Sequence, residues 1–287
     1  MLSPETFHKH VPKDKIENAE FRLFLLNEAK GNKEVQAALV WACRNDILFF
    51  INVFGWQFNP DHVEEEIGPF ITWPFQDLAL LGGTDENGER VYGIVESILD
   101  REDTRWQKSR EVGASWLVLF CIVWLCLFFR NKEALVCSRD EDSVDKADAR
   151  KSLFAKVDYI LTYLPDWMCC YDSSHRTDRT SDVIRRDMFF KFKKSGSNID
   201  GEASTPKTGV GGRYSIGLID EFGQFDEKKG YAVFSRTADS CRSRVFVFTH
   251  KDTTSMAYSL CFSQDYAGMR SIITHWSQHP DKRRGLY

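Results

Sequence analysis

The sequence lacks the features of several protein classes. Its first residues, MLSPETFHKH, contain no apolar segment, so no secretory signal is expected at this end. Its eight cysteines form no C-x-x-C pair, and several lie inside apolar runs. Neither a zinc site nor a disulfide framework is therefore predicted, and buried free thiols are expected instead. The sequence also shows no internal repeat.

A long hydrophobic run is also missing. Residues 116–129 (WLVLFCIVWLCLFF) are continuously apolar, but this run is shorter than the roughly 20 residues that a membrane-spanning helix needs. Such a run fits a helix that is buried on all sides. With 43% hydrophobic and 28% charged residues, the composition is that of a globular protein without a membrane partner.

An excess of positive charge is absent as well. The formal net charge is −4, whereas a protein that binds DNA tightly by itself usually carries a basic face and often a basic total. Any contact with DNA must therefore be local, or must arise when several copies surround the duplex.

What the 287 residues do contain is alternation between short apolar strands and helices. Residues 15–55 repeat apolar side chains near the helical period, so residues 1–70 are interpreted as a helical N-terminal subdomain or lid. Residues 71–270 are expected to form the core, and residues 271–287 the start of a linker. Apolar strands are predicted at 104–107, 134–138, 188–192, 215–220 and 244–248, with helices at 116–129 and about 143–164 and a loop at 195–213. This order indicates a largely parallel sheet covered on both faces.

The segment Lys108–Ser115 (KSREVGAS) lies between a predicted strand and the apolar helix. It is compared with the phosphate-binding pattern G-x-x-x-x-G-K-[ST]. Gly113 and Ser115 fit that pattern, but Ala114 stands where the lysine is expected, and Lys108 stands at the first glycine position.

Phosphate binding explains this segment because loop N–H groups and a helix N-terminus both attract anions. The backbone of the loop, which includes Ser109, Glu111 and Val112, would surround the phosphates. Lys108 would supply the cation that a polyphosphate requires, and the Ser115 hydroxyl would face Mg²⁺. Arg110 would lie near the terminal phosphate or brace the site. The alternative is an ordinary strand-to-helix turn in which Lys108 and Arg110 are merely solvated.

About 100 residues later, an apolar strand at 215–220 ends in Asp220 and Glu221. In a nucleotide-hydrolysing site the first carboxylate holds Mg²⁺ and the second polarises the attacking water. The glutamate favours hydrolysis over phosphoryl transfer to a substrate, because a kinase avoids a base placed for water. The alternative is an acidic strand end before a turn.

Together these residues resemble a known family, the large terminase subunits of tailed bacteriophages. The loop with its displaced Lys108 resembles their deviant Walker A motif, and Asp220 with Glu221 resembles Walker B and its catalytic glutamate. The triplet Pro74–Gln76 (PFQ) is similar to their adenine-recognition motif, and Phe248–Thr249 to their coupling motif. The resemblance covers about residues 70–287. Full-length members continue into an RNase H-like nuclease that should begin where this sequence stops, so nuclease activity is not expected from it.

The resemblance implies a RecA-like (ASCE) P-loop fold, a three-layer α/β/α sandwich with a helical N-terminal subdomain. It implies an ATPase that uses ATP and Mg²⁺ to drive double-stranded DNA into a procapsid in the host cell cytoplasm. The implied partners are the portal protein and the small terminase subunit. The chain would form a homo-oligomeric ring on the capsid, with a monomer as the free form. The alternatives are another nucleic-acid translocase or helicase-type ATPase, and a non-catalytic nucleotide-binding interaction domain, since Ala114 breaks the standard motif.

Several roles follow from the resemblance alone. Gln76 would contact the adenine edge with Phe75 packed nearby, and Thr249 would sense the terminal phosphate; an ordinary helix-start glutamine and an ordinary strand residue are the alternatives. Arg213, which follows two glycines, would enter a neighbouring subunit's site as an arginine finger. Arg110 is the competing finger within its own subunit. A set of basic positions fits either DNA phosphates or a solvated face: Arg185, Arg186, Lys191, Lys193 and Lys194.

Overall fold

The computed structural model describes residues 6–58, 67–146, 151–172, 180–205, 208–209 and 211–283. Within these residues the strands of the main sheet are β5 (Thr104–Lys108), β6 (Glu133–Ser138), β7 (Val183–Arg186), β8 (Phe189–Phe192), β9 (Asn198–Ala203), β10 (Ile216–Ile219), β11 (Arg244–Phe248) and β12 (Arg270–Thr274). Two small antiparallel ladders pair β1 (Trp56–Phe58) with β2 (Ile67–Pro69) and β3 (Gly83–Thr84) with β4 (Arg90–Val91).

The main sheet has the strand order β12-β5-β11-β10-β6-β9-β8-β7. From β12 to β9 all neighbouring strands are parallel, and β8 and β7 extend the sheet in antiparallel fashion. This arrangement confirms the largely parallel sheet predicted from the sequence. It also places β11 between β5, which precedes the candidate phosphate loop, and β10, which precedes the two carboxylates.

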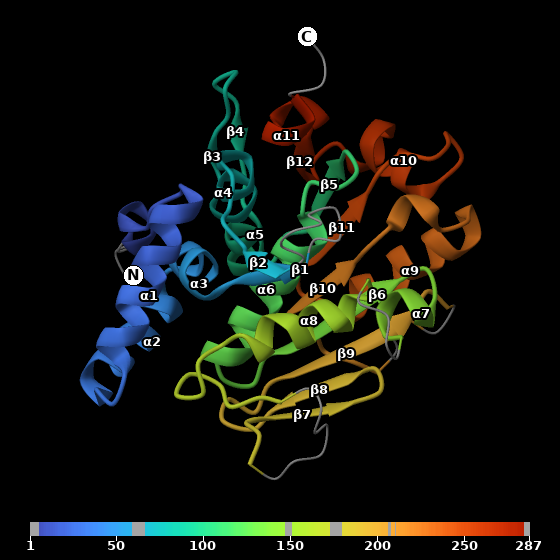
Figure 1. Ribbon diagram of the computed structural model, residues 1–287. Helices are drawn as coiled ribbons and strands as arrows, with labels where there is room; N and C mark the ends of the chain where they lie inside the picture. Colours follow the sequence, from blue (N-terminus) through green and yellow to red (C-terminus); the bar gives the residue numbers. More distant parts are fainter. Residues whose placement is uncertain are drawn as a thin grey trace.

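The α-helices are α1 (Lys15–Ala29), α2 (Lys33–Asn45), α3 (Ile47–Phe54), α4 (Pro74–Leu81), α5 (Ile94–Asp100), α6 (Ala114–Phe128), α7 (Glu141–Val144), α8 (Leu153–Thr162), α9 (Glu227–Ser240), α10 (Met256–Phe262) and α11 (Pro280–Arg283). Short 3₁₀ helices are η1 (Phe7–His10), η2 (Phe222–Gln224), η3 (Gln264–Tyr266) and η4 (Trp276–Gln278). Figure 1 shows the N-terminal helices at one side of the molecule and the sheet running across its centre.

The helices cover the sheet on both faces, which makes three layers. Alternate side chains of a strand point to opposite faces. In β11, Val245 and Val247 pack into the core that contains α6 and α8, whereas Phe246 and Phe248 pack into the core that contains α9 and α10. Figure 1 shows the same division. The sequence thus folds as the predicted α/β/α sandwich.

Helix α6 is the predicted apolar helix, and it is buried almost throughout. The sheet covers one side of it, while α3 and α8 pack against the rest. The rings of Phe50 and Phe120 meet edge to face at 6.4 Å, and the indole Nε1 of Trp124 donates a hydrogen bond of 2.7 Å to the carbonyl of Cys43. Among the described residues, no helix combines the length and the apolar character that crossing a membrane requires.

Four parts of the chain differ from the sequence prediction. The expected loop at 195–213 contains β9, and the expected linker from 271 begins inside β12. The expected helix at 143–164 is divided into α7 and α8. The helical run at 15–55 consists of three helices, each starting after a capping residue whose side chain accepts backbone N–H bonds: Asp14, Asn32 and Asp46.

Candidate active site

The candidate site lies at one edge of the sheet, where parallel strands end together. Lys108 is the last residue of β5, Thr249 follows β11, Asp220 follows β10 and Arg139 follows β6. Because the carboxyl ends of parallel strands meet at the same edge, segments far apart in the sequence converge here.

The loop between β5 and α6 has a conformation that depends on glycine. Gly113 has a φ of +73°, in the left-handed region that favours glycine, and Glu111 also has a positive φ of +57°. A Cβ atom at Gly113 would lie 2.8 Å from Nε2 of Gln76. Any other residue at 113 would therefore strain the turn and displace Gln76 from the loop.

Neighbouring elements hold this loop at several points. The N–H of Ser109 donates to the carbonyl of Thr274 at 3.0 Å, and Nε2 of Gln76 donates to the carbonyl of Val112 at 3.0 Å. Lys282 donates to the carbonyl of Arg110 and pairs with Glu111 at 3.0 Å. The hydrogen bond and charge of Lys282 lower the pKa of Glu111. The loop is thus braced by β12, α4 and α11.

The strongest feature of the site is the contact between Ser115 and Asp220. The hydroxyl of Ser115, in the first turn of α6, lies 3.0 and 2.8 Å from the two carboxylate oxygens of Asp220. Asp220 is only 5% exposed, and its backbone N–H donates to the carbonyl of Cys137 at 2.8 Å. One hydroxyl and one carboxylate are oxygen donors of the kind that Mg²⁺ prefers. The two residues assigned to the metal from the sequence are therefore adjacent, and their chemistry fits it.

Glu221 turns away from the strand that precedes it. Its φ is +52°, and its side chain is 46% exposed, in contrast to the buried Asp220. The Glu221 carboxylate lies 3.4 Å from Nε of Arg139, which also pairs with Asp140 at 3.1 Å. Sequence reasoning missed Arg139. The signal was its place directly after β6, but only the strand order shows that β6 is a neighbour of β10.

Thr249 contacts the start of the phosphate loop. Its hydroxyl donates to the carbonyl of Lys108 at 2.9 Å. A Cβ at Gly223, in the turn after Glu221, would lie 2.3 Å from the carbonyl oxygen of Thr249. The segment after β11 therefore touches both the loop and the acidic turn, and its sensing role remains a prediction.

The cationic residues of the loop are accessible to a ligand. Lys108 is partly exposed, and its ammonium forms no hydrogen bond within the described residues. Arg110 is exposed. Ala114, by contrast, is 2% exposed and belongs to the hydrophobic core, so position 114 supplies no charge to the site. A phosphate bound here would depend on Lys108 for a cation from the loop.

The geometry of Gln76 differs from the one expected for adenine recognition. Gln76 is 1% exposed; Oε1 accepts the N–H of Trp73 at 2.9 Å, and Nε2 donates to Val112. In this arrangement Gln76 braces the loop from the start of α4. Phe75 stacks on Trp73 with ring centroids 5.8 Å apart, beside His279. The adenine roles of Gln76 and Phe75 stay predictions.

The structure separates the remaining basic candidates. Arg213 is exposed, after Gly211 with its φ of +90°, as a finger on a surface loop would be. Arg185 is 2% exposed, paired with Asp145 at 2.6 Å and lying over the ring of Phe190 at 4.5 Å. The idea that Arg185 tracks DNA phosphates is therefore wrong, because its guanidinium is already satisfied inside the protein.

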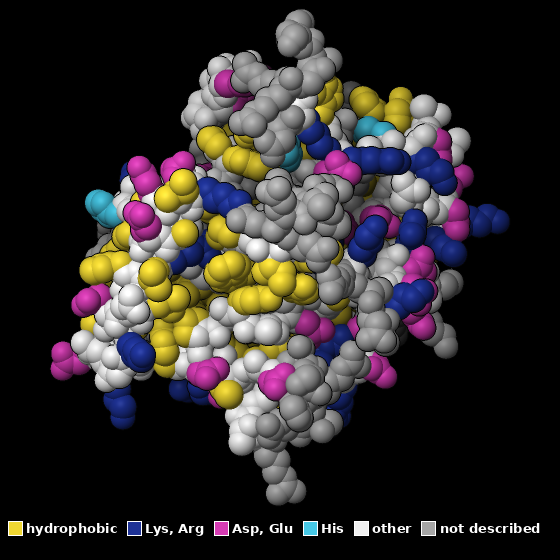
Figure 2. All heavy atoms as spheres, in the orientation of Figure 1, with side chains coloured by type: hydrophobic (Ala, Val, Ile, Leu, Met, Phe, Trp, Pro, Cys, Tyr) yellow, Lys and Arg dark blue, Asp and Glu magenta, His cyan; other side chains and the backbone are white. Residues whose placement is uncertain are grey.

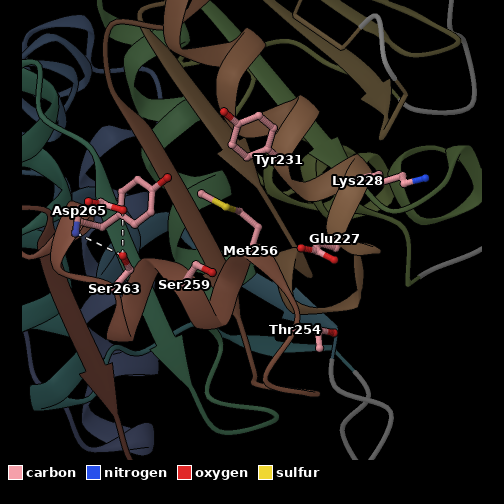
Figure 3. A pocket seen from close by; sticks show the side chains of 9 residues that line it. Glu227, Lys228, Tyr231, Thr254, Met256, Ser259, Ser263 and Asp265 are labelled. Carbon is pink, nitrogen blue, oxygen red and sulfur yellow. Dashed lines mark hydrogen bonds between the residues drawn. The ribbon is translucent and has the colours of Figure 1, made fainter.

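A separate cavity of about 550 Å³ lies between α9 and α10. Figure 3 shows Glu227 and Tyr231 from α9 facing Met256 and Ser259 from α10. None of the candidate site residues lines it. The hydrogen-bonded geometry at the sheet edge, not this cavity, therefore defines the candidate active site.

The strand order and the loop at the end of β5 define the class: the chain has a RecA-like P-loop fold with a three-layer α/β/α core. Among solved structures it is similar to the large terminase of bacteriophage HK97, with a TM-score of 0.52 and 11% identity over 80% of this chain and 43% of that chain.

Two further similarities concern the same family. The large terminase ATPase domain of Thermus phage P74-26 gives a TM-score of 0.44 and 11% identity over 63% of this chain and 79% of that one. A large terminase of a thermophilic bacteriophage, in complex with ADP, gives 0.48 and 10% over 75% and 48%. No family model and no curated protein matches the chain. The fold is thus the one found in phage large terminases, and the chain spans less than half of the HK97 protein.

Proposed function

We propose that this chain is the ATP-hydrolysing motor domain of a large terminase, which moves double-stranded viral DNA into a procapsid. The observation that carries the proposal is the Ser115–Asp220 contact at the N-terminus of α6, with Glu221 next to it. The fold shared with the HK97 large terminase supports the choice of motor over other P-loop ATPases.

In the proposed mechanism the substrate phosphates lie against the loop N–H groups and the N-terminus of α6. Lys108 places its ammonium beside them. Ser115 and Asp220 would hold Mg²⁺, which when bound neutralises charge on the phosphate oxygens. Glu221 orients a water molecule and accepts its proton as the water oxygen bonds to the terminal phosphorus. The bond from that phosphorus to the bridging oxygen breaks, and its electron pair leaves with ADP.

The proposed partners are duplex DNA, the portal protein and the small terminase subunit, in the host cytoplasm. Figure 2 shows Lys and Arg side chains at the right of the molecule interspersed with Asp and Glu. With a net charge of −4, one chain is poorly suited to hold DNA alone. A homo-oligomeric ring, in which several copies surround the duplex, fits this charge better.

A second function is favoured by one observation, the buried Ala114 where the standard motif has lysine. In that case the chain would bind nucleotide weakly and act as an interaction module. Catalysis and this alternative differ in their dependence on Lys108, since only a working site needs a cation there.

The test is ATP hydrolysis by the purified chain with and without Mg²⁺. We expect turnover that EDTA abolishes and that Lys108→Ala lowers by at least about 100-fold, because the loop then lacks its cation. Lys229→Ala, on an exposed surface of α9, removes the same charge and should change little. Full turnover by Lys108→Ala would contradict the site assignment, and absence of any turnover in the unaltered chain would favour the interaction module.

A further inference from the structure

A second lysine lies beside the candidate site, on an element that the phosphate-loop motif does not include. Lys156 is in α8, which packs along α6 (Figure 1). Its Nζ is 5.9 Å from the ring centroid of Trp116, the residue after Ser115 in the first turn of α6. Within the described residues its ammonium forms no hydrogen bond or ion pair. The ammonium is therefore free to bind a ligand.

The charges around Lys156 are those of the candidate site. Burial lowers the pKa of Lys156, the negative charge of Asp220 opposes this, the positive charge of Lys108 adds to it, and Glu221 opposes it again. One ammonium thus feels both carboxylates and the loop cation. Two lysines near each other repel, and an anion placed between them removes that repulsion.

We propose that Lys156 is a second phosphate-binding cation of this site, and that it acts on the terminal phosphate of a nucleoside triphosphate. The inference rests on the proposed function and adds a substrate-contacting residue to it. Asp220 and Glu221 mark the side of the site where the terminal phosphate and the attacking water belong. A partly buried ammonium on that side interacts more strongly with an anion than one in bulk water. Lys156 therefore distinguishes a triphosphate from a diphosphate.

The experiment compares equilibrium binding of ADP and of a non-hydrolysable β,γ-imido ATP analogue. The chains are the unaltered protein, Lys156→Met, Lys156→Arg and the control Lys229→Met on the opposite helical layer. We expect Lys156→Met to weaken binding of the triphosphate analogue by about tenfold or more, the scale of one charge-assisted contact, and to leave ADP within about twofold. Lys156→Arg should recover most of the loss, and the control should match the unaltered chain.

The same variants are also followed by thermal unfolding, because Lys156 has a second possible role in packing over Trp116. Equal weakening of both nucleotides, or a lowered unfolding temperature without any change in selectivity, would assign Lys156 to packing and overturn the inference. If the unaltered chain binds the triphosphate and Lys156→Met binds it equally well, the inference alone fails. If the unaltered chain binds neither nucleotide, the proposed function fails first and the inference falls with it.

Discussion

At the scale of single residues, Glu221 is held in an unusual position. Its backbone is left-handed, a conformation that a non-glycine residue rarely adopts, and its carboxylate is paired with Arg139. Strained backbone of this kind often accompanies function. Since both side chains are about half exposed, the pair contributes little to folding, and its value lies in orienting the carboxylate.

Arg139→Gln tests that orienting role. We expect kcat to fall by several-fold to about tenfold, because Glu221 loses the partner that limits its rotamers, while ATP affinity stays within about twofold. Stability should change by less than about 1 kcal/mol, as for other exposed pairs. Arg90→Gln, which breaks the exposed pair with Glu96 on β4, is the matched control. A higher kcat in Arg139→Gln would show instead that Arg139 restrains Glu221.

Which site residues the sequence could reveal depended on whether they lie in a local motif. Ser115 and Asp220 are recognisable because each sits at a fixed place after a strand, and the structure joins them. Arg139 and Lys156 belong to no local pattern. They reach the site only because β6 is paired with β10 and α8 packs on α6, and strand order and helix packing are not written in any short segment.

At the scale of elements, burial decides what could be predicted. β11 matches the predicted strand residue for residue because it is buried on both faces and all apolar apart from Arg244. β9 (NIDGEA) was expected to be loop, because its polar residues and glycine carry little β-propensity and Ile199 is its one fully buried side chain. β12 ends the sheet and exposes Ile273, so it too lacks an apolar pattern.

The start of α4 and the phosphate loop form one connected unit through Gln76. If Gln76 is a brace, Gln76→Ala should weaken ATP and GTP binding by a similar factor, because the loop that holds the phosphates is loosened for both. Losing the buried bonds to Trp73 and Val112 should also cost about 1–3 kcal/mol of stability. Measuring both affinities together with thermal unfolding decides the matter. Loss of ATP binding alone, with GTP unchanged, would favour the adenine role.

At the scale of the whole molecule, one chain presents only part of the proposed machine. The N-terminal helices share a single hydrophobic core with α6, so the described part of the chain holds its site rigidly without help. Arg213, however, is exposed on a glycine-rich loop. A finger arginine must reach a phosphate, and an exposed loop is suited to reach one in a neighbouring copy.

Arg213 therefore links turnover to assembly. If it acts in a neighbouring subunit, ATP turnover per chain should rise with protein concentration as copies associate, and Arg213→Ala should remove that rise while leaving the slow basal rate. The measurement is turnover across a concentration series, with the associated fraction followed by sedimentation. Turnover per chain that stays flat during association, with Arg213→Ala unchanged, would reject the role between subunits.

The account's central claim is that the edge formed by β5 and β10 hydrolyses ATP, with Asp220 organising the metal and Glu221 the water. A residue that acts on water contributes mainly in the transition state, so its removal lowers kcat far more than it weakens binding. Asp220, which is buried against Ser115, should affect both.

The most direct measurement is ATP binding and single-turnover hydrolysis by Glu221→Gln and Asp220→Asn beside the unaltered chain. We predict that Glu221→Gln binds ATP within about threefold of the unaltered chain but hydrolyses it about 10²–10⁴-fold more slowly, the usual contribution of general-base help. Asp220→Asn should lose both Mg²⁺-dependent binding and hydrolysis. Hydrolysis at the unaltered rate by Glu221→Gln would contradict the account.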